Sequence, residues 1–241
     1  MKRKIRRILY AIASTTFIFG LLAIAYPYLS DWINKQTTSK LYSDYLDMAR
    51  SMDTTEVNRM LQIAEEYNVR LLGNSLRWMP SDEANTAYVD TLDTSGTGIM
   101  CYIEIPKINL RLPVYHGTEE TTLQIAVGHM QGSSLPIGGK GTHAVLSGHN
   151  GLVSQSIFTE LDKMEIGDTF TLTVFGNKLE YKVDEINIVL PEDFNYFNID
   201  AYHDYVTLVT CTPFGVNSHR LLIRGERIDY TNEQNRLEVR F

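Results

Sequence analysis

The segment TFTLTVF-GN-KLEYKVDEINIVL, residues 169–190, decides the fold class of this chain. Apolar and polar side chains alternate along residues 169–175 and 178–190, which is the period of a half-buried β-strand. Gly176-Asn177 separates the two runs and predicts a tight hairpin turn. Similar short runs occur at residues 99–105, 144–146, 205–210 and 220–224. Many short strands with few helices between them predict a mostly β domain, built as an antiparallel barrel or a sandwich.

The first thirty residues have the pattern of a membrane anchor. An uncharged, mainly apolar run covers residues 8–28, and about 20 apolar helical residues span a hydrocarbon core of about 30 Å. Tyr26, Tyr28 and Trp32 suit the outer interface of the membrane. The run is preceded by five cations, Lys2, Arg3, Lys4, Arg6 and Arg7. Cations mark the cytoplasmic side, so we expect a single-pass anchor with the rest of the chain outside the cell.

A cleaved signal peptide is the alternative for the same segment. Ala23-Ile24-Ala25 would then be its small-residue cleavage site. The apolar run is long for a signal peptide, which favours an uncleaved anchor. Both alternatives place the following residues outside the cytoplasm.

Residues 30–73, between the anchor and the strands, have helical spacing of their apolar side chains. Asp53 followed by Glu56 is a capping pattern, so we expect two amphipathic helices with a break near Asp53. Gly73 is expected to end the second helix. Residues 74–98 are polar and contain proline and glycine. They predict a long loop, and loops of this length inside a compact domain are often functional lids.

Composition excludes several classes of function. A chain of 241 residues has room for one domain and an appendage. A formal net charge of −7 argues against binding of nucleic acid, because phosphate binding needs a basic face. Cys101 and Cys211 are too few for a disulfide scaffold and lack CxxC or zinc-ligand spacing. We therefore expect no metal site at the cysteines; the acyl transfer considered below for Cys211 would need no cofactor.

Cys211 has the sequence context of a nucleophile. It ends the strand pattern of TLVTCTP, residues 207–213, and Pro213 stops strand pairing directly after it. The thiol is therefore held at a rigid strand end beside a loop. An inert buried cysteine is the alternative interpretation. Cys101 lies inside the first predicted strand, and we interpret it as such a buried thiol.

Two further residues complete a candidate acyl-transfer site. Arg220 follows Cys211 by nine residues, and a short turn would return it beside the thiol, where a guanidinium can hold an oxyanion. His149 ends an apolar strand between Gly148 and Gly151 and could exchange protons with a substrate amine. Taken alone, Arg220 could be a surface ion pair and His149 a hydrogen-bonded loop residue. The residues alone do not choose among six histidines: His116, His129, His143, His149, His203 and His219.

The motifs around these residues resemble those of sortases. TLVTC at 207–211 is similar to the family's TLxTC motif, and TPFG-VNSHR at 212–220 resembles the segment with its arginine. SGHNGL at 147–152 resembles the strand end with its histidine, and SLPIGG at 134–139 the segment before it. The resemblance covers residues 98–226. It implies a closed sortase β-barrel and a catalytic site of Cys211, His149 and Arg220.

The flanking segments resemble class C, the pilus-building sortases. AEEYNVRL at 64–71 is similar to the class C helix AxxYNxxL, and VYHGT at 114–118 and FTEL at 158–161 also resemble this class. Class C members usually carry an Asp-Pro-aromatic lid over the site. Here the corresponding stretch reads RWMPSD, with Trp78, Pro80 and Asp82 as the candidate lid residues. Trp78 would either plug the cleft or pack on the barrel rim, and we expect a weak or partly open lid.

The resemblance implies a membrane-anchored cysteine transpeptidase. Its partners would be surface proteins or pilins bearing a Leu-Pro-x-Thr-Gly-like sorting signal and an acceptor amine, for which class C implies a pilin lysine. A housekeeping sortase that uses a cell-wall precursor amine is one alternative. A non-enzymatic anchored β-domain that binds extracellular protein is the other. The expected domains are a basic tail and anchor, helices with a lid-like loop, the sortase barrel and a C-terminal tail, at residues 1–29, 30–98, 99–230 and 231–241.

Overall fold

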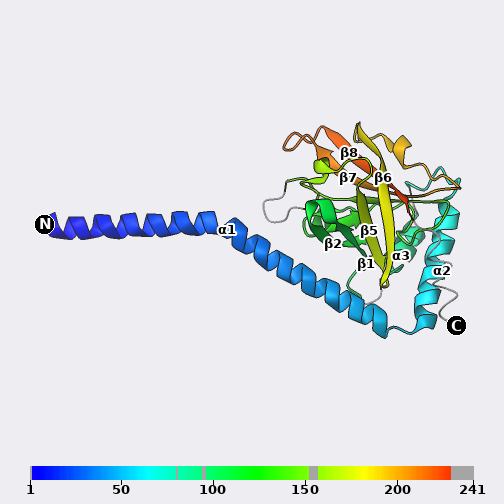
Figure 1. The fold of residues 1–241 in the computed structure, drawn as a ribbon, viewed down its shortest axis with the longest axis horizontal. Helices are drawn as coiled ribbons and strands as arrows, with labels where there is room; N and C mark the ends of the chain where they lie inside the picture. The colour runs from blue at the N-terminus through cyan, green and yellow to red at the C-terminus, as the bar shows by residue number, and fades with distance from the viewer. Residues whose placement is uncertain (1, 80, 94–95, 152–156, 229–241) are drawn as a thin grey trace.

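The computed structural model describes residues 2–79, 81–93, 96–151 and 157–228. Eight strands in this part of the chain close into a barrel in the order β1-β2-β3-β4-β7-β8-β6-β5 (Figure 1). Their bounds are β1 Ile99–Ile105, β2 Leu110–His116, β3 Val127–His129, β4 Thr142–Ser147, β5 Thr169–Val174, β6 Asn177–Val189, β7 Asp204–Thr212 and β8 His219–Arg227. The prediction of a mostly β, closed barrel is confirmed.

The sequence pattern predicted an antiparallel barrel, but two of its strand pairs are parallel. β2 pairs with β3 and β4 pairs with β7 in parallel, and the other six pairs are antiparallel. Alternation of side chains does not carry strand direction, because both kinds of strand place successive residues on opposite faces. The parallel β4–β7 pair matters for the candidate site, since it brings two strand ends that are far apart in sequence to the same end of the barrel.

The helices precede the barrel or lie in its connections. They are α1 Lys2–Ser51, α2 Thr54–Leu71, α3 Asp82–Val89 and α4 Glu120–Leu123, with short 3-10 turns η1 Pro106–Ile108, η2 Leu161–Lys163 and η3 Phe194–Phe197. The predicted break is confirmed, because the Asp53 side chain caps α2 by accepting a hydrogen bond from the Thr55 N–H at 3.0 Å. The anchor and the first amphipathic helix form one helix, since residues 28–51 contain neither glycine nor proline to separate them.

The predicted 74–98 loop contains the short helix α3. An eight-residue helix has little stability of its own, and tertiary packing stabilises this one. Tyr88, near its end, is almost fully buried, and its hydroxyl lies 2.8 Å from Nδ1 of His129 and 3.0 Å from the Gly117 N–H. The loop prediction was therefore wrong for this stretch, because the burial of Tyr88 depends on residues distant in sequence.

The β5–β6 hairpin turns one residue earlier than Gly176-Asn177 predicts. Val174 pairs with Asn177, so the two turn residues are Phe175 and Gly176, both with positive φ (47° and 82°). A bulky residue rarely adopts this conformation. Phe175 is held there because its ring is buried in the core and its N–H donates to the Tyr45 hydroxyl of α1 at 2.8 Å. A tertiary contact thus overrides the local turn preference.

Two helices are attached to the barrel in different ways. The C-terminal part of α1 packs by Tyr42 and Tyr45 against Tyr102 of β1, with ring centroids 5.0 and 5.1 Å apart. Its N-terminal half extends away from the barrel (Figure 1). α2 is clamped by Asn68, only 3% exposed, whose amide donates to the Leu135 carbonyl at 3.1 Å and accepts from the Leu135 N–H at 2.6 Å.

Candidate functional site

Cys211 and Arg220 are cross-strand neighbours. The β7–β8 register places them directly opposite each other, and opposed residues of an antiparallel pair have Cβ atoms about 4.5–5.5 Å apart. β7 ends one residue later, at Thr212, and the Thr212–Pro213 peptide bond is cis. The six-residue turn before β8 therefore returns Arg220 beside the thiol, as the sequence spacing predicts.

The parallel β4–β7 pair brings His149 to the same place. Ser147 pairs with Val209, and beyond the ladder the Gly148 N–H donates to the Val209 carbonyl at 3.0 Å. His149 and Cys211 each follow this last pair by two residues, so both lie at this end of the barrel. The Asn150 side-chain amide also donates to the Cys211 carbonyl at 2.9 Å. Three separate segments thus meet at one strand end.

This constellation lies on the outer face of the barrel. Leu208 and Leu221 belong to the main core inside the barrel. Because successive side chains of a strand alternate between faces, Cys211 and Arg220 point outward together with Val209. The site is therefore open to a substrate that lies along the outside of β7.

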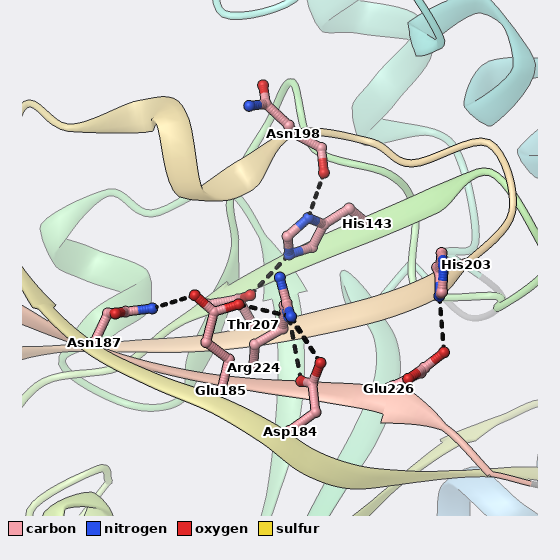
Figure 2. A network of polar contacts seen from close by, with 9 residues as sticks. All are labelled: His143, Asp184, Glu185, Asn187, Asn198, His203, Thr207, Arg224 and Glu226. Atoms are coloured by element: carbon pink, nitrogen blue, oxygen red, sulfur yellow. Dashed lines mark hydrogen bonds and ion pairs between the residues drawn. The ribbon is translucent and has the colours of Figure 1, made fainter.

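Burial removes two histidines from the list of candidates. The pKa values of His129 and His143 are lowered to about 4, chiefly because burial disfavours the charged imidazolium. Each is also held at both ring nitrogens. In His143, Nδ1 donates to the Asn198 carbonyl at 2.9 Å and Nε2 lies 2.7 Å from the Thr207 hydroxyl (Figure 2). These two histidines are structural.

Geometry removes three more histidines. His116 lies against the Thr91 carbonyl, and burial lowers its pKa. His203 pairs with Glu226 at 2.8 Å, at the opposite end of β7 from Cys211 (Figure 2). His219 pairs with Thr212, one residue beyond the Cys211–Arg220 pair, so its side chain lies on the other face of the sheet. The fold thus leaves His149 as the candidate imidazole, in agreement with the motif that resembles the sortase histidine segment.

The two cysteines differ as the sequence analysis expected. Cys101 is 0% exposed, and burial raises the pKa of its thiol far above the ordinary range. Cys211 is partly exposed, and neither cysteine is in a disulfide. Cys101 is therefore an inert core residue, whereas Cys211 is accessible.

The glycines around His149 make room for two aromatic rings. A Cβ at Gly148 would lie 2.7 Å from the Phe158 ring, and one at Gly151 would lie 2.2 Å from the Phe214 ring. Gly151 also has a φ of +93°. Both glycines are needed because aromatic rings pack directly on the backbone that carries His149.

The candidate lid residues are only partly described. Trp78 packs against Phe194 and Phe197, with ring centroids 5.1 and 6.1 Å apart. It covers an apolar patch, here called the outer cluster, made of Val145, Val189, Phe197, Val209 and Leu222. Pro80 lies outside the described residues, and so does the side chain of Asp82, whose backbone begins α3.

Arg77 fixes the position of this stretch. Its guanidinium donates to the carbonyls of Gly132 at 3.3 Å and Phe197 at 2.8 Å, and it lies 4.4 Å from the centre of the Trp78 ring. Trp78 is therefore held against the outer cluster.

Sequence reasoning missed two residues that touch the site. Asn150 follows His149 directly, and its amide could have been suspected from that position. Glu120 of α4, whose carboxylate lies 3.3 Å from Nε2 of His149, gives no local signal, because 28 residues separate the two in the chain. Among the described residues, no group of three or more His, Cys, Asp or Glu side chains is placed to hold a metal ion.

Comparisons with known proteins agree with this fold. A family model described as a sortase domain matches residues 103–228. The structure of sortase C1 from Streptococcus agalactiae is 44% identical, with a TM-score of 0.75, covering 79% of this chain and 98% of that chain. Sortase C from Clostridium perfringens, solved with the C-terminal cell wall sorting motif, is 39% identical, with a TM-score of 0.69, covering 79% and 99%.

A curated relative is more distant. Sortase D of Bacillus subtilis (strain 168) is 31% identical over 129 residues, which is 52% of this chain and 62% of that protein. The chain therefore spans less than two thirds of the length of this relative.

The different environments of the two thiols predict selective alkylation. In the native full-length chain, iodoacetamide should modify Cys211 at least about 100-fold faster than Cys101, because Cys101 reacts only through opening of the core. Mass spectrometry of tryptic peptides over time measures both rates in one sample. Cys101→Ser should leave the Cys211 rate unchanged. Equal rates for the two cysteines would contradict the assigned burial.

Proposed function

Because the chain belongs to the sortase family, whose members are cysteine transpeptidases, we propose that it transfers sorting-signal-bearing proteins to an amine through Cys211. The observation that carries this proposal is the β7–β8 register, which sets Cys211 opposite Arg220. The parallel β4–β7 pair adds His149 from a third segment. A nucleophile, a proton carrier and a stabiliser of negative charge are the groups that acyl transfer requires.

The proposed reaction has two steps. In the first, the Cys211 thiolate attacks the threonyl carbonyl of a Leu-Pro-x-Thr-Gly-like signal. The carbon–sulfur bond forms, the Thr–Gly amide bond breaks, and His149 gives a proton to the departing glycine amine. In the second, His149 takes a proton from the incoming amine, whose nitrogen attacks the thioester and releases Cys211. Atoms and protons balance without a cofactor.

Arg220 is suited to hold the oxyanion of both tetrahedral intermediates. Its Nη1 donates to the carbonyls of Asn217 at 3.2 Å and His219 at 3.1 Å. A guanidinium has five N–H donors in a rigid planar fork, so these contacts orient the group and leave donors for a substrate oxygen. Donors fixed in advance stabilise developing charge most effectively.

The outer cluster supports binding of an apolar residue upstream of the scissile bond. Val209 and Leu222 form its floor two residues along β7 and β8 from Cys211 and Arg220. An extended peptide advances about 3.3 Å per residue, so a signal with its threonine at Cys211 would place its proline or leucine over this cluster. Trp78 packs against the same cluster, chiefly through Phe197, which is why we propose it as the candidate plug.

We propose a pilin lysine as the acceptor amine. Support comes from the likeness to the class C structures and from Asn68, which joins the class-C-like helix to the SLPIGG segment through Leu135. A housekeeping enzyme would use the same three residues with a cell-wall precursor amine, so the identity of the acceptor separates the two. A non-enzymatic binding domain would form no thioester at Cys211.

The anchor is proposed from the helix α1. Its segment Ile5–Tyr26 is long and apolar enough to cross a membrane, by length and composition. About 28 Å of helix, at about 1.5 Å per residue, separates Tyr26 from Tyr45, where α1 docks on the barrel. The β7–β8 turn, orange in Figure 1, lies on the side of the barrel toward which the N-terminal half of α1 extends. This arrangement would face the site toward membrane-held substrates.

The thioester is the decisive test of the proposed reaction. Mass spectrometry of the full chain with a Leu-Pro-x-Thr-Gly peptide should detect an acyl adduct on Cys211. Cys211→Ala should lower turnover by at least about 1,000-fold with folding intact, because only the sulfur is lost. Arg220→Lys should lower turnover by about 100-fold, since a point charge lacks the planar fork. Turnover by Cys211→Ala would falsify the assignment.

The lid is tested at Trp78. If Trp78 plugs the cleft, Trp78→Ala should speed alkylation of Cys211 by about 3- to 10-fold, because the open fraction rises. Cleavage of the peptide should rise with it. Tyr202→Ala, which removes an exposed aromatic residue elsewhere on the surface, is the matched control and should change neither rate. Unchanged alkylation in Trp78→Ala would show that the ring only packs on the rim.

The proposed topology is tested with protease added to intact protoplasts. The barrel should be digested and only the stub with residues 1–29 protected, because the cations before Ile8 stay in the cytoplasm. Permeabilised protoplasts are the control, in which the stub is also lost. Full protection of the barrel would reverse the orientation, and a mature N-terminus near Tyr26 would show that the segment is cleaved.

A further inference from the structure

His149 has an acidic neighbour that the proposed mechanism does not use. Oε2 of Glu120 lies 3.3 Å from its Nε2, and the two side chains are 68% and 26% exposed. Glu120 begins α4, in the connection between β2 and β3. A carboxylate only accepts hydrogen bonds, so this contact favours the tautomer with the proton on Nε2. Nδ1 then remains for proton exchange with the thiol or the substrate amine.

Both partners of this contact are held by other groups. The Gln124 side chain donates to Oε1 of Glu120 at 3.1 Å, and the Gln124 N–H donates to the Glu120 carbonyl at 3.0 Å. On the other side, the Phe158 N–H donates to the His149 carbonyl at 3.0 Å, and Asn150 ties the same loop to the Cys211 carbonyl. The contact therefore joins two fixed segments.

We propose that Glu120 is a positioning residue for His149, which fixes its tautomer and stabilises the imidazolium. This inference rests on the proposed function, because it assumes that His149 carries protons in acyl transfer. When His149 takes a proton from the thiol or the acceptor amine, the ring becomes positive beside a carboxylate. Glu120 would thus act like the carboxylate that orients the imidazole of a catalytic triad, although Glu120 is far more exposed than such a carboxylate usually is.

The charges near His149 decide whether its protonated, positive ring is stabilised. The positive charge of Arg220 disfavours that form, whereas the carboxylate of Glu120 favours it. The other ionisable groups on adjoining segments are Glu119, Glu160, Cys211 and His219, and residues 152–156 carry none. The Glu119 carboxylate is directed to Gly117, where a Cβ would lie 2.1 Å from its Oε2. Glu119 thus carries the same charge as Glu120 and is its neighbour in the chain, but its carboxylate is directed away from His149. It is therefore the matched control.

The effect of Glu120 on kcat must be modest, because the Glu120–His149 pair is exposed. Exposed ion pairs change an equilibrium by about two- to five-fold, and salt screens them. Glu120→Gln, which keeps an acceptor and removes the charge, should lower kcat by about two- to five-fold at low salt and by less at 0.5 M salt. Glu120→Ala, which also removes the acceptor, should lower kcat by about ten-fold with little change in KM.

The experiment uses the full chain in detergent micelles with ¹⁵N-labelled histidine. Ring nitrogen shifts, assigned with His149→Asn, should show the Nε2–H tautomer of His149 in the parent and a mixture in Glu120→Ala. Glu119→Gln and Glu119→Ala should leave kcat, salt dependence and tautomer at the parent values.

The outcomes separate the two proposals. Full turnover in His149→Ala would overturn the role of His149 and with it the proposed function. If His149→Ala is inactive but the Glu120 variants match the Glu119 variants in kcat and tautomer, the role of Glu120 is overturned while the function stands. A drop in kcat without any change of tautomer or salt dependence also overturns it, because a merely structural defect would give that result.

Discussion

The placement of β7 between β4 and β8 is the constraint on which the rest of this structure depends. β4 pairs with β7 in parallel and β8 pairs with it antiparallel, so the end of β4, the end of β7 and the start of β8 meet at one edge. These are the positions of His149, Cys211 and Arg220. Without the parallel pair, the histidine and the cysteine would lie at opposite ends of the barrel.

The registers of β7 and β8 are fixed by polar contacts away from Cys211. Figure 2 shows Arg224 of β8 bonded to Asp184 and Glu185 of β6, with distances of 2.7 and 2.6 Å. In the same figure the Thr207 hydroxyl of β7 meets His143 of β4. A slip of β7 by one residue would break the Thr207–His143 contact and turn every side chain of β7 to the other face. Structural residues remote from Cys211 therefore keep the thiol on the outer face.

The stretch before the barrel is fixed on both sides of the candidate lid. Asn68 clamps α2 to Leu135, and Tyr88 anchors α3 at His129. Between them, Arg77 holds Trp78 against the outer cluster. Movement of this stretch is thus confined to a short segment, because the buried hydrogen bonds on either side are costly to break.

The sequence by itself determined the strand content, the N-cap of α2 at Asp53 and the apolar segment long enough to span a membrane. It also determined the three motifs with Cys211, His149 and Arg220. Those features depend on local periodicity and on residues close together in the chain. Only the tertiary structure decided the direction of β4 beside β7, the early turn at Phe175, the helix around Tyr88 and the contact of Glu120 with His149. Each of these depends on pairing or burial between residues far apart in the chain, and side-chain alternation carries no information about which strands become neighbours.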